Sequence, residues 1–132
     1  MVKNLTIRTN CREELIDITH LVREEIKQAN VRDGMIFLHV PHTTAAITIN
    51  ENADPHVKRD IIYKLNKEIP KSDGYNHGEG NSDAHIKSSL FGPTLQLIIS
   101  DSELVLGTWQ GILFCEFDGP RTRHLYLKIV SD

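Results

Sequence analysis

The sequence has no long hydrophobic segment, little cysteine and few aromatic residues. Among its 132 residues only two are cysteine, and Phe, Trp and Tyr together make up 6%. No apolar run approaches the roughly 20 residues that a helix needs to cross a bilayer, so we expect no membrane partner. The 39% of hydrophobic and 25% of charged residues are typical of a soluble globular protein and exclude a wholly disordered chain.

Basic residues are missing from a long stretch of the second half, since Ser88 to Pro120 contains no Lys or Arg. Over the whole chain 15 basic residues stand against 18 acidic ones, which gives a formal net charge of −3. Domains that bind nucleic acids usually carry a basic patch or stripe. We therefore expect no nucleic acid among the partners.

The two cysteines, Cys11 and Cys115, lie far apart in the sequence and form no CxxC pair. This argues against a thiolate metal site or a dithiol redox site and favours free, buried thiols. No apolar signal-peptide segment precedes the first strand-like residues. We therefore expect a cytoplasmic location.

The spacing of apolar residues predicts one domain, residues 1–132, that contains both strands and helices. Strands are expected at residues 3–8, 35–40, 43–50, 95–99, 109–117 and 122–130, the last three as a β-meander. Helices are expected at residues 14–30 and 55–69, with a short third one at 83–91. Asp54 and Pro55 mark the start of the second helix, and Val57, Ile61, Leu65 and Ile69 its buried face. The sum is an α+β fold, a largely antiparallel sheet system with two main helices on it.

Seven histidines are the unusual feature of the composition, and they point to metal or acid–base chemistry. His77 and His85 lie with Glu79 and Asp83 in a glycine-rich segment without hydrophobic periodicity. Long loops of this kind are often functional, and imidazole and carboxylate are ligands that zinc prefers. The spacing matches no established metal motif, so a solvated loop with incidental histidines is an equal alternative.

The helix that begins near His85 offers a second interpretation of the same region. Free N–H groups at a helix N-terminus favour anions, and Lys87 and Ser88 could help to bind a phosphate there. The alternative is simple capping of the helix by Ser82 or Asp83.

Polar residues also flank the strand at residues 43–50. His42 follows Pro41 at a strand break, and Glu51 comes just before the Asp54 cap. Residues in loops held by rigid strands often contact ligands, which makes His42 a candidate ligand and Glu51 a candidate general base. His39 lies inside an apolar run and is expected to be a core or sheet-face residue.

Two further motifs lie toward the C-terminus. Trp109, the only tryptophan, could stack on an aromatic substrate, and a core position is the alternative. Arg121 and Arg123 share one strand face because side chains alternate, and two adjacent guanidinium groups suit a phosphate or pyrophosphate. Their alternative role is surface pairing with Glu116 or Asp118.

Five motifs in this order resemble the YjbQ-like family. They are His42-Thr43-Thr44, Asn50 to Pro55, Asp83 to Leu90, Gly107-Thr108-Trp109-Gln110 and Glu116 to Arg121, spread over about residues 3–130. The resemblance implies an α+β fold with a mixed or mostly antiparallel β-sandwich, a homotrimer and a metal ion at a histidine-lined site. It also implies a secondary thiamine-phosphate-synthase activity, which joins hydroxymethylpyrimidine diphosphate to a thiazole phosphate and releases pyrophosphate.

The residues and the resemblance combine into one hypothesis, because this reaction mainly needs charge neutralisation and positioning. A divalent metal ion, zinc or magnesium, would be held by His42, His77 and His85. The small phosphorylated substrate would be bound by Lys87, Ser88, Trp109, Arg121 and Arg123. The candidate catalytic residues are His85, Glu51 and Glu116, with the carboxylates assisting proton transfer. The rival hypothesis is a non-catalytic trimer that binds a metal or a phosphorylated metabolite.

Overall fold

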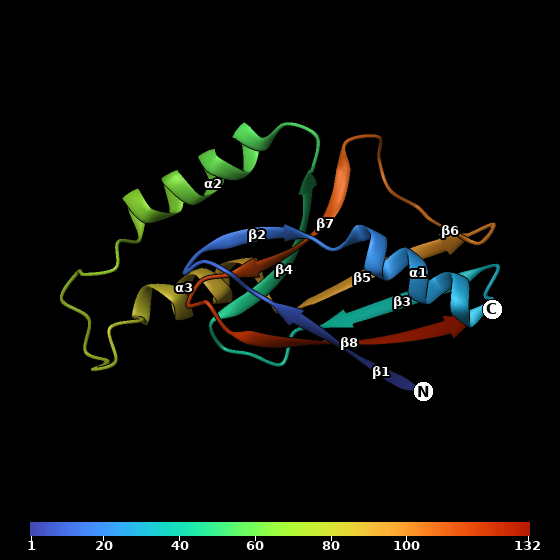
Figure 1. Ribbon diagram of the computed structural model, residues 1–132, viewed down its shortest axis with the longest axis horizontal. Coiled ribbons are helices and arrows are strands. Elements are labelled where there is room, and N and C mark those ends of the chain that lie inside the picture. Colours follow the sequence, from blue (N-terminus) through green and yellow to red (C-terminus); the bar gives the residue numbers. More distant parts are fainter.

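The computed structural model describes all 132 residues, which form eight strands and three helices (Figure 1). The strands are β1 (Val2–Arg8), β2 (Glu14–Asp17), β3 (Gly34–His39), β4 (Ala45–Glu51), β5 (Thr94–Ser100), β6 (Glu103–Leu104), β7 (Gln110–Glu116) and β8 (Thr122–Ser131). The helices are α1 (Thr19–Ala29), α2 (Pro55–Glu68) and α3 (Ser82–Phe91). None of these helices has both the length and the apolar character needed to cross a bilayer.

The strands form two sheets, and every strand pairing is antiparallel. The larger sheet has the order β1-β8-β3-β5-β6, and the smaller one has the order β2-β7-β4. The predicted α+β fold with a mostly antiparallel sandwich is confirmed, and α3 is the short third helix predicted at residues 83–91.

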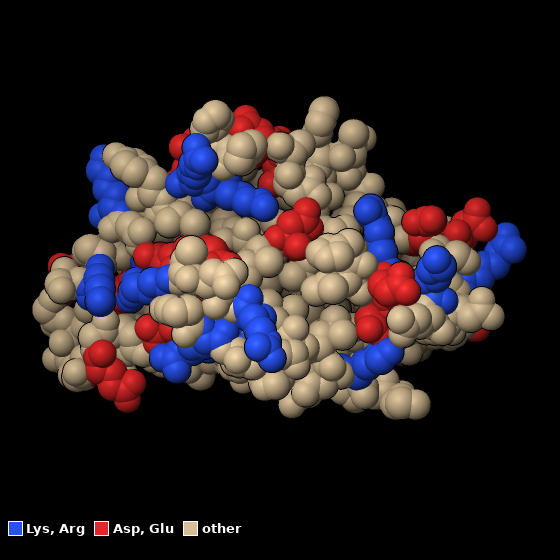
Figure 2. Space-filling model, in the orientation of Figure 1, with Lys and Arg blue, Asp and Glu red and all other residues tan.

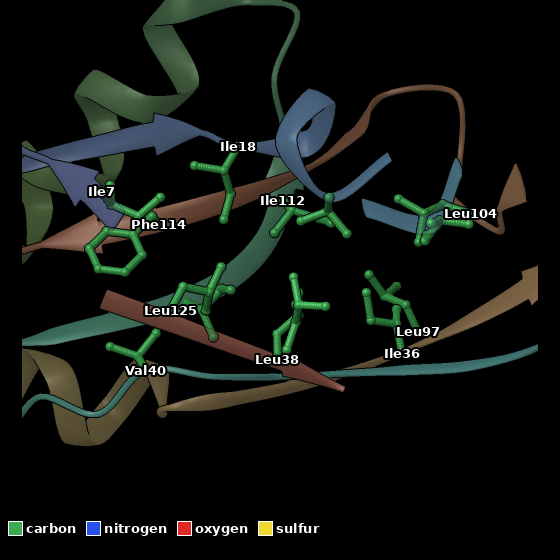
Figure 3. Close-up of a cluster of buried hydrophobic side chains, with 14 of the residues drawn as sticks. Ile7, Ile18, Ile36, Leu38, Val40, Leu97, Leu104, Ile112, Phe114 and Leu125 are labelled. Atoms are coloured by element: carbon green, nitrogen blue, oxygen red, sulfur yellow. The ribbon is translucent and has the colours of Figure 1, made fainter. Parts of the chain in front are cut away.

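The main hydrophobic core lies between the two sheets (Figure 3). Burial alternates along β3 because successive side chains point to opposite faces, so Ile36 and Leu38 point inward. They meet Leu125 of β8 and, from the smaller sheet, Ile112 and Phe114 of β7. Burial of such side chains stabilises the fold by about 1.5–3 kcal/mol each.

Strand β7 is buried on both of its faces. Ile112 and Phe114 belong to the core between the sheets, whereas Leu113 and Cys115 belong to a second cluster that Ile61 of α2 partly covers. A strand covered on both sides fits the centre of a sheet, and β7 lies between β2 and β4. The predicted β-meander is therefore wrong, since β5 and β8 are in the larger sheet.

The predicted helix at residues 14–30 is wrong in its first part. Residues 14–17 form β2, which pairs with β7 from Glu14 opposite Glu116 to Asp17 opposite Leu113. The Asp17 carboxylate then accepts a 2.9 Å hydrogen bond from the Thr19 N–H group, and α1 begins there. Pairing with a strand almost 100 positions away leaves no signal in the local spacing of apolar residues.

Helix α2 begins as predicted, with Asp54 accepting a 2.9 Å hydrogen bond from the His56 N–H group and Pro55 in the first position. None of its residues is fully buried, however. The expected buried face (Val57, Ile61, Leu65 and Ile69) lines an open apolar groove beside Leu90 and Phe91. The predicted face is therefore the inward face of α2, but it is only half-buried.

The surface carries charges of both signs, and Figure 2 shows Lys and Arg interspersed with Asp and Glu on one face of the molecule. Both cysteines are free thiols, as predicted. Cys115 is buried, but Cys11 is exposed, because it lies in the loop between β1 and β2. The expectation of burial is wrong for Cys11.

Candidate functional site

A polar pocket of about 720 Å³ lies where three loop segments meet. The segments are residues 39–44 between β3 and β4, residues 77–85 at the start of α3, and residues 118–123 between β7 and β8. The pocket contains four histidines and two arginines: His39, His42, His77, His85, Arg121 and Arg123. Such a lining suits a polar, negatively charged ligand better than an apolar one.

Arg123 is held at the back of this pocket by Glu116. Its Nε atom lies 2.9 Å from Glu116 Oε1, and its Nη2 atom donates to the Thr44 hydroxyl at 2.8 Å. Glu116 is completely buried and also accepts from the Thr9 hydroxyl at 2.8 Å. Arg123 is therefore rigidly placed, and Glu116 acts on the pocket through it.

The turn before β8 sets the position of Arg121. A side chain at Gly119 would lie 2.5 Å from the carbonyl oxygen of Cys11, so only glycine fits this close approach. The half-exposed Arg121 donates to Asp118 Oδ2 at 3.0 Å, and Asn81 Nδ2 donates to the same oxygen at 2.8 Å. Asp118 thus connects the turn to Asn81, the residue just before α3.

His42 is oriented by the backbone of β8. Its Nε2 atom accepts a 2.8 Å hydrogen bond from the His124 N–H group, which leaves the proton of a neutral imidazole on Nδ1. Partial burial lowers the pKa of His42, and the charges of Arg123 and His124 lower it further. The lowered pKa favours the neutral imidazole form of His42.

His77 and His85 lie next to each other, with their rings edge to face and their centroids 5.4 Å apart. The Glu79 carboxylate is 3.8 Å from His77 Nε2. The donor types suit a divalent metal, but no three His, Cys, Asp or Glu side chains are grouped closely enough to hold one. His42, His77 and His85 therefore line the same pocket without converging on one point.

Lys87 and Ser88 were predicted to bind phosphate, but the structure places both outside the pocket. The Lys87 side chain is fully buried and its Nζ atom contacts Asp83 at 2.8 Å, Asn66 at 2.6 Å and Glu13 at 3.1 Å. Ser88 is also buried, and its hydroxyl has no hydrogen-bond partner. Neither side chain is accessible to a ligand in this arrangement.

Glu51 and Trp109 lie at the opposite end of the smaller sheet. Glu51 ends β4, seven residues beyond Thr44 of the pocket, a distance of about 23 Å in an extended strand. Its carboxylate accepts from the Asp54 N–H group at 3.2 Å. Trp109 is 63% exposed, so the alternative of a core position is wrong, and its carbonyl accepts from Asn52 nearby.

His39, Asn81 and Asp118 are among the pocket residues that were not predicted as site residues. Of its two expected positions, His39 takes the one on the sheet face: it is exposed on the outer face of the larger sheet and borders the pocket. Asn81 and Asp118 also line the pocket. Each is within four residues of a predicted site residue, and Asp118 is also the expected surface partner of the arginines, as its 3.0 Å contact with Arg121 confirms.

Fold and pocket together define a class of small α+β proteins in which two antiparallel sheets face each other and a histidine- and arginine-lined pocket lies at one end. The chain belongs to the YjbQ-like family, since the family model described as "UPF0047 protein YjbQ-like" matches residues 3–132.

Relatives of known sequence and structure support this membership. The UPF0047 protein MJ1081 of Methanocaldococcus jannaschii is 57% identical over 100% of this chain and 96% of its own length. The UPF0047 protein YugU of Bacillus subtilis is 47% identical, over 99% of this chain and 100% of its own. A crystal structure of a yjbq/upf0047 family protein from Clostridium acetobutylicum is 52% identical, with a TM-score of 0.95, and covers 97% of this chain and 99% of that one.

Proposed function

We propose that this protein is a thiamine-phosphate-synthase-type transferase that works in the histidine–arginine pocket. It would join hydroxymethylpyrimidine diphosphate to a thiazole phosphate and release pyrophosphate. One observation carries the proposal: two arginines and four histidines from three distant segments line a single polar pocket. Both substrates are phosphorylated, and guanidinium groups bind phosphates with paired hydrogen bonds.

The chemistry requires little from the protein beyond positioning and neutralisation of charge. The bond between the pyrimidine methylene carbon and the diphosphate oxygen breaks, and its electron pair leaves with pyrophosphate. The thiazole nitrogen then uses its lone pair to form the new C–N bond. Negative charge grows on the departing pyrophosphate, where Arg121 and Arg123 would stabilise it. In the metal-free pocket, His85 would donate a proton to the leaving group.

Several residues would have roles that differ from those expected from the sequence. Glu116 would position Arg123, because its oxygens are already bonded to Arg123 and Thr9. Lys87 and Ser88 would support α3 rather than touch phosphate. Glu51 is too far from the pocket of its own chain to act there.

We propose that the protein is a homotrimer in which other copies cover the outer face of the larger sheet. This outer face consists of Met35, Phe37, Ile98, Tyr126 and Val130, which are 37–56% exposed. Met35 lies opposite both Ile98 and Val130, so the apolar side chains form one patch. Contiguous exposed patches of this kind mark interaction sites. His39 borders the same face, so a neighbouring copy docked there would lie close to the pocket.

We also propose that the pocket binds a divalent cation, zinc or magnesium. When bound, it would neutralise charge on the diphosphate. His77 and His85 would be its first ligands, because their rings are adjacent, and His42 would have to use Nδ1. We also place the protein in the cytoplasm, where its accessible Cys11 thiol would stay reduced.

The test is turnover of the two substrates by wild type, His85→Ala and His20→Ala, an exposed histidine on α1 outside the pocket. We expect His85→Ala to lower kcat/KM by about a hundredfold or more, the usual contribution of a general acid. His20→Ala should leave it unchanged. Metal content by plasma mass spectrometry and molar mass by light scattering are measured on the same samples. Full activity in His85→Ala would contradict the site, and tight pyrophosphate binding without turnover would favour the rival, a binding protein.

A further inference from the structure

Four charged side chains form a closed ring between α3 and the chain that enters β2. Arg12 donates to both oxygens of Asp83 at 3.0 and 3.3 Å, and to Glu13 at 3.2 Å. Lys87 closes the ring with contacts of 2.8 Å to Asp83 and 3.1 Å to Glu13. Its third contact, 2.6 Å to Asn66 Oδ1, connects the ring to α2. The ring has two positive and two negative charges and joins three segments.

Burial of this ring is costly for the fold. Asp83 and Lys87 are 0% exposed, and the side chain of Glu13 is 12% exposed. Removing charges from water costs several kcal/mol for each ion, and the attraction between them often only balances that cost. Net stability is therefore a weak reason for such a ring, whereas fixing one arrangement is a role that buried polar groups are known to have.

Helix α3 has few apolar contacts that could fix its position instead. Ala84 is its one buried hydrophobic residue, and Phe91 packs edge to face on Phe117 at the far end, with ring centroids 5.4 Å apart. Ile86 and Leu90 point outward, at 39% and 65% exposure. No apolar stripe therefore fixes the orientation of the first turns of α3 about the helix axis. The hydrogen bonds and ion pairs of the ring are the directional contacts at these turns.

The same turns carry two residues of the pocket. Asn81 and His85 are one helical turn apart and line the pocket, and Asp83 lies between them on the side of the ring. A small rotation or shift of α3 would move both pocket residues together. Such displacements of about 1 Å can cost a hundredfold in activity.

We propose that the ring of Arg12, Glu13, Asp83 and Lys87 is the device that positions Asn81 and His85 in the pocket. Asp83 and Lys87 are then positioning residues, which act through α3 and never touch the ligand. This proposal rests on the proposed function only in its choice of pyrophosphate as the ligand. The position of α3 can be measured without any ligand.

The test compares Lys87→Met with the double variant Lys87→Met/Glu13→Gln, which removes one charge of each sign and leaves the Arg12–Asp83 pair. Lys87→Met should lower the Tm, because it leaves an excess carboxylate in a buried place. The double variant should regain most of that loss. In both variants we expect α3 amides to exchange hydrogen at least about tenfold faster, since local opening sets this rate. The Kd for inorganic pyrophosphate should rise about tenfold or more in both.

The proposal would be overturned if the double variant showed wild-type amide exchange in α3 and wild-type affinity for pyrophosphate. The ring would then affect only the stability of the fold and not the position of α3. If the double variant does not fold, the single variant Glu13→Gln, which keeps Lys87 paired with Asp83, takes its place. Wild-type hydrogen exchange of the α3 amides in Glu13→Gln would then contradict the proposal. Arg32→Ala, which breaks an exposed pair with Asp101, is the matched control. If wild type does not bind pyrophosphate, the proposed function fails, while the exchange measurement still decides the role of the ring.

Discussion

At the scale of single residues, the pocket depends on a buried ion pair rather than on free charges. Glu116 is 0% exposed and Arg123 only 4%, and each satisfies the other. The sequence predicted that Arg121 and Arg123 would act together, and both do line the pocket. It could not predict their unequal exposure, because Thr9 and Thr44, which complete the surroundings of the pair, come from other parts of the chain.

Glu116→Gln should destabilise the fold strongly, because it leaves the Arg123 guanidinium buried without a counter-charge. We expect a loss of about 3–5 kcal/mol in the free energy of unfolding. Urea unfolding followed by circular dichroism measures it. Glu68→Gln is the control, since the Lys64–Glu68 pair is exposed to solvent and is expected to contribute little to stability. A loss for Glu116→Gln no larger than that of the control would show that the pair does not hold the turn.

At the scale of secondary structure, local sequence signals predicted most helices and strands well, but they predicted poorly which elements pack or pair with each other. The start of α2 follows from Asp54 and Pro55, which act within one turn. Strand β2 was missed because Leu15 and Ile16 fit a helical pattern as well as a strand, and only pairing with β7 decides between them. The position of Lys87 on α3 was predictable, but its burial depends on Glu13 and Asn66, which are distant in sequence.

Helix α3 should be sensitive to acid through Asp83. Burial alone would raise the pKa of this carboxyl, but hydrogen bonds from Arg12 and Lys87 outweigh it and hold the pKa below the usual 3.8. The unfolded chain therefore binds the proton first, and the contribution of Asp83 to stability is present above pH 3.8 and is lost as the pH falls through the lowered pKa.

The comparison that isolates this effect is between wild type and Asp83→Asn. The difference in their free energies of unfolding should be constant above about pH 5 and should shrink in more acidic buffer. Denaturant titrations from pH 7 to pH 2.5 would follow it. The corresponding difference for Asp101→Asn, at the surface, should stay small throughout. If the difference in free energy of unfolding between wild type and Asp83→Asn grew as the pH fell, the pKa of Asp83 would not be lowered by folding.

At the scale of the whole molecule, the pocket exists only because the fold brings three distant segments together. The histidines of the 77–85 segment reach those of the 39–44 segment because α3 packs on β4, and the turn at 118–121 reaches both from between the two sheets. The five motifs of the family resemblance predicted the fold, and three of the predicted site residues within them, His42, His85 and Arg121, line the pocket. Glu51 and Trp109 were grouped with them by motif alone, although Glu51 ends β4 and Trp109 precedes β7 at the other end of the smaller sheet.

Calorimetric titration of inorganic pyrophosphate tests the central claim, that this pocket binds the phosphates of the substrate, most directly. Wild type should bind about one pyrophosphate per chain, and Arg121→Ala should weaken that binding about tenfold or more, because the accessible guanidinium in the pocket is lost. Arg32→Ala, on the surface outside the pocket, should bind as the wild type does. Equal affinity in wild type and Arg121→Ala, or no binding by wild type, would contradict the claim.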